Sequence, residues 1–128
     1  MISWVNYYLN FNRIGDLEQK AGDHGAAAAA WEQAAARYGE HGFFNNAIAL
    51  CNKILSLDPS QYRIYLELAR YQARKRVIYD VKQNLTIYRD QMGSNGKVDQ
   101  ARDALVEFEE QFRSWADLRG VLDELLDR

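Results

Sequence analysis

Short turns between strongly helical segments constrain this chain more than any other feature of its sequence. Apolar residues recur almost throughout at the three- and four-residue spacing of an amphipathic helix, and sustained strand-like alternation is absent. Gly22, Gly42 and Gly96 interrupt this pattern, and each is expected to end one helix and release the next. Connections of about two to five residues force consecutive helices to lie antiparallel. The chain is therefore predicted to be an all-α array of antiparallel helix hairpins.

The predicted helices cover most of the chain. About seven helices are expected, and the helical pattern is found in eight segments: 3–9, 10–21, 25–39, 43–57, 60–75, 77–91, 97–112 and 114–127. Residues 1–128 are taken as a single domain, in which residues 10–112 form the repeat helices. Residues 1–9, with Trp4, Val5, Tyr8 and Leu9 on one face, are expected to cap one end. Residues 113–128 are expected to cap the other, because the ends of a repeat array usually differ from its interior.

Two local features refine this scheme. In the connection "SLDPSQ", Asp58 is the expected N-cap of the following helix, and Pro59 its first residue, where the missing N–H costs nothing. In the last segment an apolar stripe lies opposite acidic residues. The stripe can fold back on the array, meet another copy, or receive the next repeat of a longer chain; it consists of Leu118, Val121, Leu122, Leu125 and Leu126.

Composition narrows the class of protein. The 128 residues are 48% hydrophobic and 27% charged, as expected for a globular domain with a buried core. Cys51 is the single cysteine, so neither an internal disulfide nor a thiolate metal cluster is possible, and a cytoplasmic location is expected. No run of residues approaches the roughly 18 apolar positions that a membrane helix needs.

Residues 28–61 resemble one tetratricopeptide repeat. Eight anchors match the family's pattern of aromatic, small, tyrosine, turn glycine, aromatic, alanine, bulky residue and closing proline: Trp31, Ala35, Tyr38, Gly42, Phe44, Ala47, Cys51 and Pro59. Residues 62–95 follow the pattern loosely, with Arg76 in place of the turn glycine. The resemblance implies a right-handed superhelix of helix pairs. It also implies a non-catalytic adaptor or scaffold that holds a partner protein in a groove.

The segment 60–75 carries the candidate binding residues. In tetratricopeptide proteins the first helix of each pair lines the concave groove, and this segment would be such a helix. Arg63, Glu67, Arg70 and Arg74 share one face of it at helical spacing. Three guanidiniums can grip carboxylates bidentately, so an acidic peptide or protein surface is the expected partner. The alternative is a solvated face on which Glu67 pairs with its neighbouring arginines.

The same groove would receive residues from the preceding repeat. These are acidic or small, namely Ala29, Glu32, Gln33, Ala36 and Glu40. The family's carboxylate clamp, which grips a chaperone's terminal carboxylate, needs lysine and asparagine there. Binding of a chaperone tail by that clamp is therefore not expected.

No residue pattern predicts an enzyme, a metal site or a cofactor. His24 and His41 fall in turns without a second set of ligands. Cys51 occupies a position that the repeat fills with a buried bulky side chain, so a packed thiol is expected rather than a nucleophile. The segment "GSNG" at 93–96 lacks the preceding strand of a phosphate loop, and the acidic run that holds Glu107, Glu109 and Glu110 is explained by a solvated helix face.

Charge is distributed unevenly, which suggests two further functions. The net charge is −2, but residues 62–90 hold seven basic and three acidic side chains, and residues 98–128 hold four basic and nine acidic ones. One alternative is therefore structural self-association, with the basic segment of one copy facing the acidic segment of another. The other is RNA binding by the tyrosine- and arginine-rich stretch, which the acidic net charge disfavours.

Overall fold

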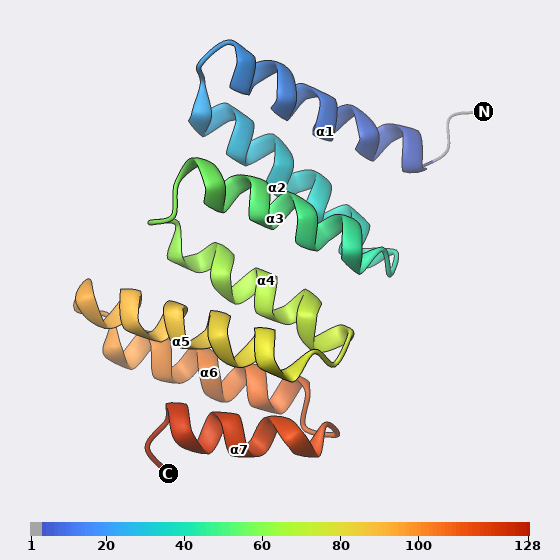
Figure 1. Ribbon diagram of the computed structural model, residues 1–128. Coiled ribbons are helices and arrows are strands. Elements are labelled where there is room, and N and C mark those ends of the chain that lie inside the picture. The colour runs from blue at the N-terminus through green and yellow to red at the C-terminus, as the bar shows by residue number, and fades with distance from the viewer. Residues whose placement is uncertain (1–3) are drawn as a thin grey trace. The chain divides into compact units, whose positions relative to one another are not determined.

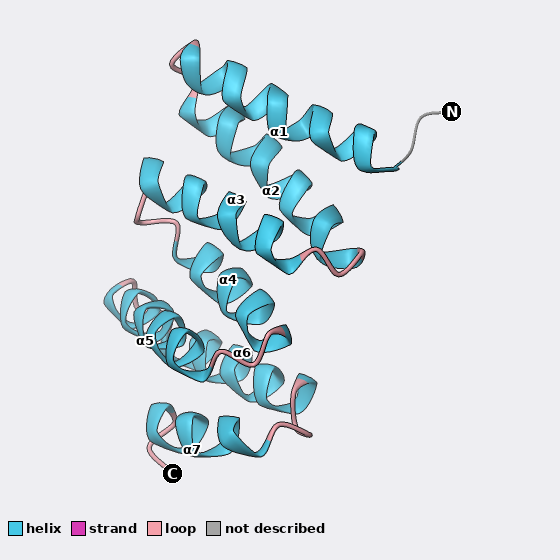
Figure 2. Ribbon diagram, turned by 45° about the vertical axis from the view of Figure 1, so that its right-hand side comes forward, coloured by secondary structure: helices cyan, strands magenta, loops and turns pink. Residues whose placement is uncertain are grey.

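The structure of the protein is a computed structural model that describes residues 4–128, with side chains from residue 11 onward. Within that range seven helices follow one another in chain order: α1 (Trp4–Lys20), α2 (His24–Glu40), α3 (Phe44–Leu57), α4 (Tyr62–Arg74), α5 (Ile78–Ser94), α6 (Val98–Gln111) and α7 (Ala116–Leu125). Short turns join them, and no strand occurs among these residues (Figures 1 and 2). The predicted all-α array of consecutive helix pairs is confirmed. None of these seven helices is long and apolar enough to cross a membrane.

The chain divides into two compact units, Met1–Ile64 and Tyr65–Arg128, with the boundary inside α4. In the N-terminal unit α1 packs on α2 and α2 on α3, and each helix reverses the direction of the one before it (Figure 1). In the C-terminal unit α5 packs on α6, and α7 packs on both of them. The antiparallel order follows from the three- and four-residue turns, which are too short to carry the chain back along a helix.

Trp31 is the centre of the core in the N-terminal unit. Its side chain is 1% exposed, while Ala27 and Ala47 are fully buried. Small residues of this kind let helices approach closely around a large side chain. Gly15 of α1 shows how close the approach is, since a Cβ atom on it would lie 2.3 Å from Cδ1 of Trp31. The predicted burial of Trp31 and Tyr38 is confirmed, with Tyr38 at 4% exposure.

The apolar stripe of the last helix completes the core of the C-terminal unit. Leu118 is 1% exposed and Leu122 fully buried, and they lie in the same unit as the fully buried Leu85 and Phe108 of α5 and α6. Val121, Leu125 and Leu126 are buried as well. Of the alternatives for this stripe, the structure shows the one in which it folds back on its own chain.

Two predicted boundaries are wrong. The segments 3–9 and 10–21 are one continuous helix, because the residues around Asn10 include neither glycine nor proline and a single asparagine is too weak a breaker to end a helix. The predicted apolar face of Trp4, Val5, Tyr8 and Leu9 falls on side chains outside those described. The segment 77–91 also continues further than expected, to Ser94.

The predicted N-cap at Asp58 is also wrong. Asp58 is the C-cap of α3, and α4 begins only at Tyr62. Its Oδ1 atom accepts hydrogen bonds from the backbone N–H of Ser60 at 3.0 Å and from the Ser60 hydroxyl at 2.5 Å. These bonds, the hydroxyl first, lower the pKa of the Asp58 carboxyl. Asp58 thus forms a local turn with Ser60 in place of the expected cap. An aspartate side chain accepts hydrogen bonds from nearby backbone N–H groups in a turn as readily as from those at the start of a helix.

Helix boundaries recur at an interval that the sequence pattern did not reveal. α2, α3 and α4 begin at residues 24, 44 and 62, and α5, α6 and α7 begin at 78, 98 and 116, each 54 residues later. Buried positions recur at the same interval: Ala27 and Val81, Trp31 and Leu85, Ala47 and Ala101, Cys51 and Leu105, Ile54 and Phe108, Ile64 and Leu118, Leu68 and Leu122. The chain therefore repeats a three-helix element.

Four turns share one backbone conformation, and in three of them a glycine adopts it. Gly22, Gly42 and Gly96 have φ angles of 85°, 80° and 72°, which confirms their predicted role at helix ends. Arg76 takes the same place between α4 and α5 with a φ of 57°. A left-handed conformation costs a residue that carries a Cβ atom roughly 1–2 kcal/mol. Arg76 thus adopts with strain a conformation that the three glycines adopt without it.

Candidate functional site

The four predicted binding residues lie on α4 as expected, on the side away from its buried residues. Ile64 and Leu68 of this helix are 1% and 3% exposed. Arg63 and Arg74 are exposed, and Glu67 and Arg70 are partly exposed. The hydrophobic spacing of the sequence accounts for this division, since the apolar residues form one stripe and the charged ones another. Arg63 belongs to the N-terminal unit and the other three to the C-terminal unit, so each group is described within its own unit.

Arg63 forms a bidentate ion pair with Glu32 of α2. Its two terminal nitrogens reach the two carboxylate oxygens, with Nη2 at 2.8 Å from Oε1. The side chain of Arg63 is 58% exposed and that of Glu32 35% exposed, so water reaches both. Glu32 was one of the residues predicted to line the same groove. The two helices therefore present one opposite-charge pair at the surface.

Arg70 is the most enclosed of the three arginines, with a side chain that is 26% exposed. It forms an ion pair with Glu67 one turn earlier, as the solvated-face interpretation predicts. Its Nε atom also donates a 3.3 Å hydrogen bond to Oε1 of Gln111 in α6. A partly buried amide pair lies on the opposite side of α4, where Oε1 of the buried Gln72 accepts a 2.8 Å hydrogen bond from Asn84.

Arg74 reaches an aromatic cluster that the sequence did not indicate as a site. Its guanidinium carbon lies 5.7 Å from the ring centre of Phe112, and that of Arg76 lies 6.0 Å from the ring centre of Trp115. A cavity of about 200 Å³ opens between these four residues and Gln111. Sequence reasoning missed Phe112 and Trp115 because both resemble core residues. The one available signal was Arg76 in the position of a turn glycine.

A separate polar cluster joins the three helices of the N-terminal unit. Nζ of Lys53 in α3 lies 2.5 Å from Oδ1 of Asp16 in α1 and 4.5 Å from the ring centre of Trp31 in α2. Nε1 of Trp31 donates a 3.1 Å hydrogen bond to the same carboxylate. The bond from Lys53 is the main cause of the lowered pKa of Asp16. The cluster fixes α1 against α2 and α3.

The residues considered for chemistry lie apart from one another. His24 begins α2 and His41 caps its other end, both exposed, and Cys51 is buried at 2% exposure. Glu109 pairs with Arg128, Glu110 pairs with Arg113, and Glu107 is exposed, as a solvated helix face predicts. Among the described side chains, residues 11–128, no three histidine, cysteine or acidic side chains are close enough together to hold a metal ion.

A cavity of about 500 Å³ lies in the C-terminal unit between the end of α5, the start of α6 and the end of α7. Its apolar part includes Leu105 and Leu125, while Arg89 and Arg102 at its edge are balanced by Asp90 and Asp127. Arg89 is bound to Asp90 at 3.0 Å and to the carbonyl of Leu125 at 3.4 Å. Opposite charges in equal number give this cavity no preference for a charged ligand.

No family model, curated protein or solved structure matches this chain. The candidate site is defined by the geometry of its own residues.

Proposed function

We propose that this protein is a non-catalytic adaptor, similar to tetratricopeptide repeat proteins, that binds an acidic segment of a partner protein along α4. The observation that carries the proposal is the row of guanidiniums on one face of this helix. Arg63, Arg70 and Arg74 are all reachable by water, and each already contacts a carboxylate or an aromatic ring. These contacts hold the arginine side chains in place before a partner's carboxylate binds.

Exchange of partners on this row costs little. Ion pairs between exposed side chains contribute about 0–1 kcal/mol. An incoming carboxylate can therefore replace Glu32 on Arg63 or Glu67 on Arg70 without a large loss of stability. Stiff helices reduce the entropy lost on binding, because few side chains and no loops have to be ordered.

Self-association is supported less well by the contacts. Lys82 of the basic segment pairs with Glu124 of the acidic segment at 3.0 Å within one chain. This internal pair uses charges that head-to-tail assembly would need. RNA binding is also supported less well, because Tyr62, Tyr65 and Tyr71 of α4 are only partly exposed and Tyr79 is the one strongly exposed tyrosine of that stretch. An acidic protein segment, met in the cytoplasm, remains the partner that we propose.

Affinity capture from a cell extract, followed by mass spectrometry, tests the proposal. The variant Arg63→Gln/Arg70→Gln should keep its helical circular dichroism but lose the partners that wild type retains. A matched control is Arg13→Gln/Arg102→Gln, which removes the same charge from two exposed arginines for which the described side chains provide no ion pair. The control should retain the same partner proteins as wild type, and each of these proteins should contain an acidic segment. Recovery of the same proteins by the first variant would contradict the proposal.

A further inference from the structure

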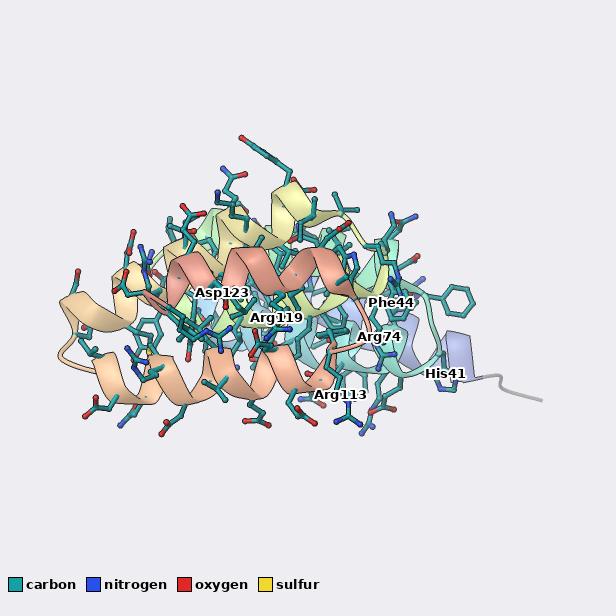
Figure 3. All side chains as sticks on the ribbon, turned by 90° about the horizontal axis from the view of Figure 1, so that it is seen from below. His41, Phe44, Arg74, Arg113, Arg119 and Asp123 are labelled. Atoms are coloured by element: carbon teal, nitrogen blue, oxygen red, sulfur yellow. The ribbon has the colours of Figure 1, made fainter. Side chains whose placement is uncertain are left out.

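The turn between α6 and α7 gathers a second group of arginines around the cluster reached by Arg74. Two cavities meet there and share Phe112 and Trp115 as walls. The first, of about 200 Å³, is lined by Arg74 and Arg76, and the second, of about 210 Å³, by residues that include Arg119. In Figure 3 Arg113 is labelled at the end of α6, where the chain turns into α7, and Arg119 is labelled between α6 and α7.

The charges of this cluster are unbalanced. Arg113 is bound to Glu110 at 3.1 Å, and the two carboxylates nearest to Arg128 come from Glu109 and Asp123. Arg74, Arg76 and Arg119 have no ion-pair partner among the side chains that the structure describes. Glu109 and Glu110 also line the second cavity, but they are bound to Arg128 and Arg113. The three guanidiniums therefore remain as excess positive charge around the two cavities.

Strain at Arg76 is the second, independent observation. The corresponding turns carry glycine at this place, and Arg76 is the only one of the four residues that adopts the left-handed backbone while carrying a Cβ atom. Unfavourable backbone conformations persist where the surroundings hold them, and they are concentrated at sites of function. Here the conformation places the guanidinium beside Trp115, at the edge of the first cavity. A glycine at position 76 would adopt this conformation without strain, but the first cavity would then lack the positive charge of Arg76.

From these observations we infer that the cluster formed by Arg74, Arg76, Arg119, Phe112 and Trp115 is a docking site for the carboxylate side chains of an acidic peptide. Arginine binds carboxylates bidentately, and the two adjacent cavities suit two successive acidic side chains. A nucleic acid fits less well. Single strands need an exposed aromatic face for stacking, and Trp115 is only 7% exposed and lies under Arg76.

The inference rests on the proposed function only for the acidic character of the partner. Its decisive residues are Arg76 and Arg119, which do not belong to the row on α4. Failure of the two proposals can therefore be distinguished, because Arg63→Gln/Arg70→Gln tests the row and Arg76→Gly/Arg119→Gln tests the cluster. Replacing Arg76 with glycine removes the strain, so this variant is expected to be at least as stable as wild type.

Fluorescence anisotropy with fluorescein-labelled hexaglutamate provides the test. Wild type and the matched control Arg13→Gln/Arg102→Gln should bind it with Kd values within about twofold of each other. Arg76→Gly/Arg119→Gln should raise Kd about tenfold or more, as expected from the loss of charge-assisted hydrogen bonds. Binding should weaken between dilute buffer and about 150 mM salt.

Three results would overturn the inference. One is no binding of hexaglutamate by wild type in dilute buffer. Another is an equal loss of affinity in the control pair, which would assign binding to net charge alone. The third is a labelled oligothymidylate of the same length that binds as tightly as hexaglutamate and is equally sensitive to Arg76→Gly/Arg119→Gln. That result would identify a general polyanion site instead of one for acidic peptides.

Discussion

Gly15→Ala tests the close packing of α1 on α2. The added Cβ atom would lie 2.3 Å from both Cδ1 and Nε1 of Trp31, more than 1 Å inside ordinary contact, so the ring has to move. Trp31 has little room, because it is 1% exposed and its indole N–H is bound to Asp16 at 3.1 Å. Overpacking of this kind costs about 1–3 kcal/mol. Loss of the indole hydrogen bond adds about 1 kcal/mol.

Helix propensity acts in the opposite direction. Alanine is favoured over glycine by about 1 kcal/mol inside a helix. The net effect expected for Gly15→Ala is a loss of about 1–3 kcal/mol in the free energy of unfolding, with Tm lowered by about 5 °C or more. Urea and thermal unfolding followed by circular dichroism measure it. In the control Gly120→Ala nothing lies within 4 Å of the new Cβ atom, so a gain in stability is expected. If Gly15→Ala proves as stable as this control, the packing described around Trp31 is wrong.

Three further predictions concern stability. Arg76→Gly should raise the free energy of unfolding by about 0.5–1 kcal/mol, because it removes an arginine from a left-handed conformation. Gly42→Ala should lower it by about 1 kcal/mol, because it places a Cβ atom on a left-handed residue. Urea titration measures both changes. The lowered pKa of Asp16 means that its stabilising effect is present above the pKa of the unfolded chain and is lost as pH falls through the folded value. The difference in unfolding free energy between wild type and Asp16→Asn should therefore be constant near neutral pH and shrink below about pH 4; a difference independent of pH would count against the Lys53 contact. Leu122→Ala, at a fully buried position, should cost about 2–5 kcal/mol by the same titration, and a negligible cost would mean that α7 does not pack on its own chain.

The class of fold was predictable because its signals are local. Helical spacing and turn glycines depend on neighbours in sequence, so the antiparallel order and the ends at Gly22, Gly42 and Gly96 could be derived without coordinates. The predicted helix boundaries were wrong where two local preferences compete. At Asp58 the side-chain turn with Ser60 displaced the expected cap, and near Asn10 a weak breaker was taken for a strong one.

The 54-residue interval was not recognised because equivalent positions carry different residues. Ala27 and Ala47 lie 20 residues apart, as do Val81 and Ala101, and these spacings do not fit a single 34-residue repeat. Burial rather than residue type is what recurs, as Trp31 and Leu85 show. Contacts at the surface were less predictable still. The face of α4 followed from spacing, but the pairing of Arg63 with Glu32 depends on the approach of a helix far away in sequence.

Amide hydrogen exchange, followed by mass spectrometry on the chain alone and bound to a captured partner, tests the central claim most directly. If an acidic segment binds along α4, exchange should slow in residues 62–76, with little change in α1. Protection confined to α1, or unchanged exchange in residues 62–76 of the complex, would contradict the account.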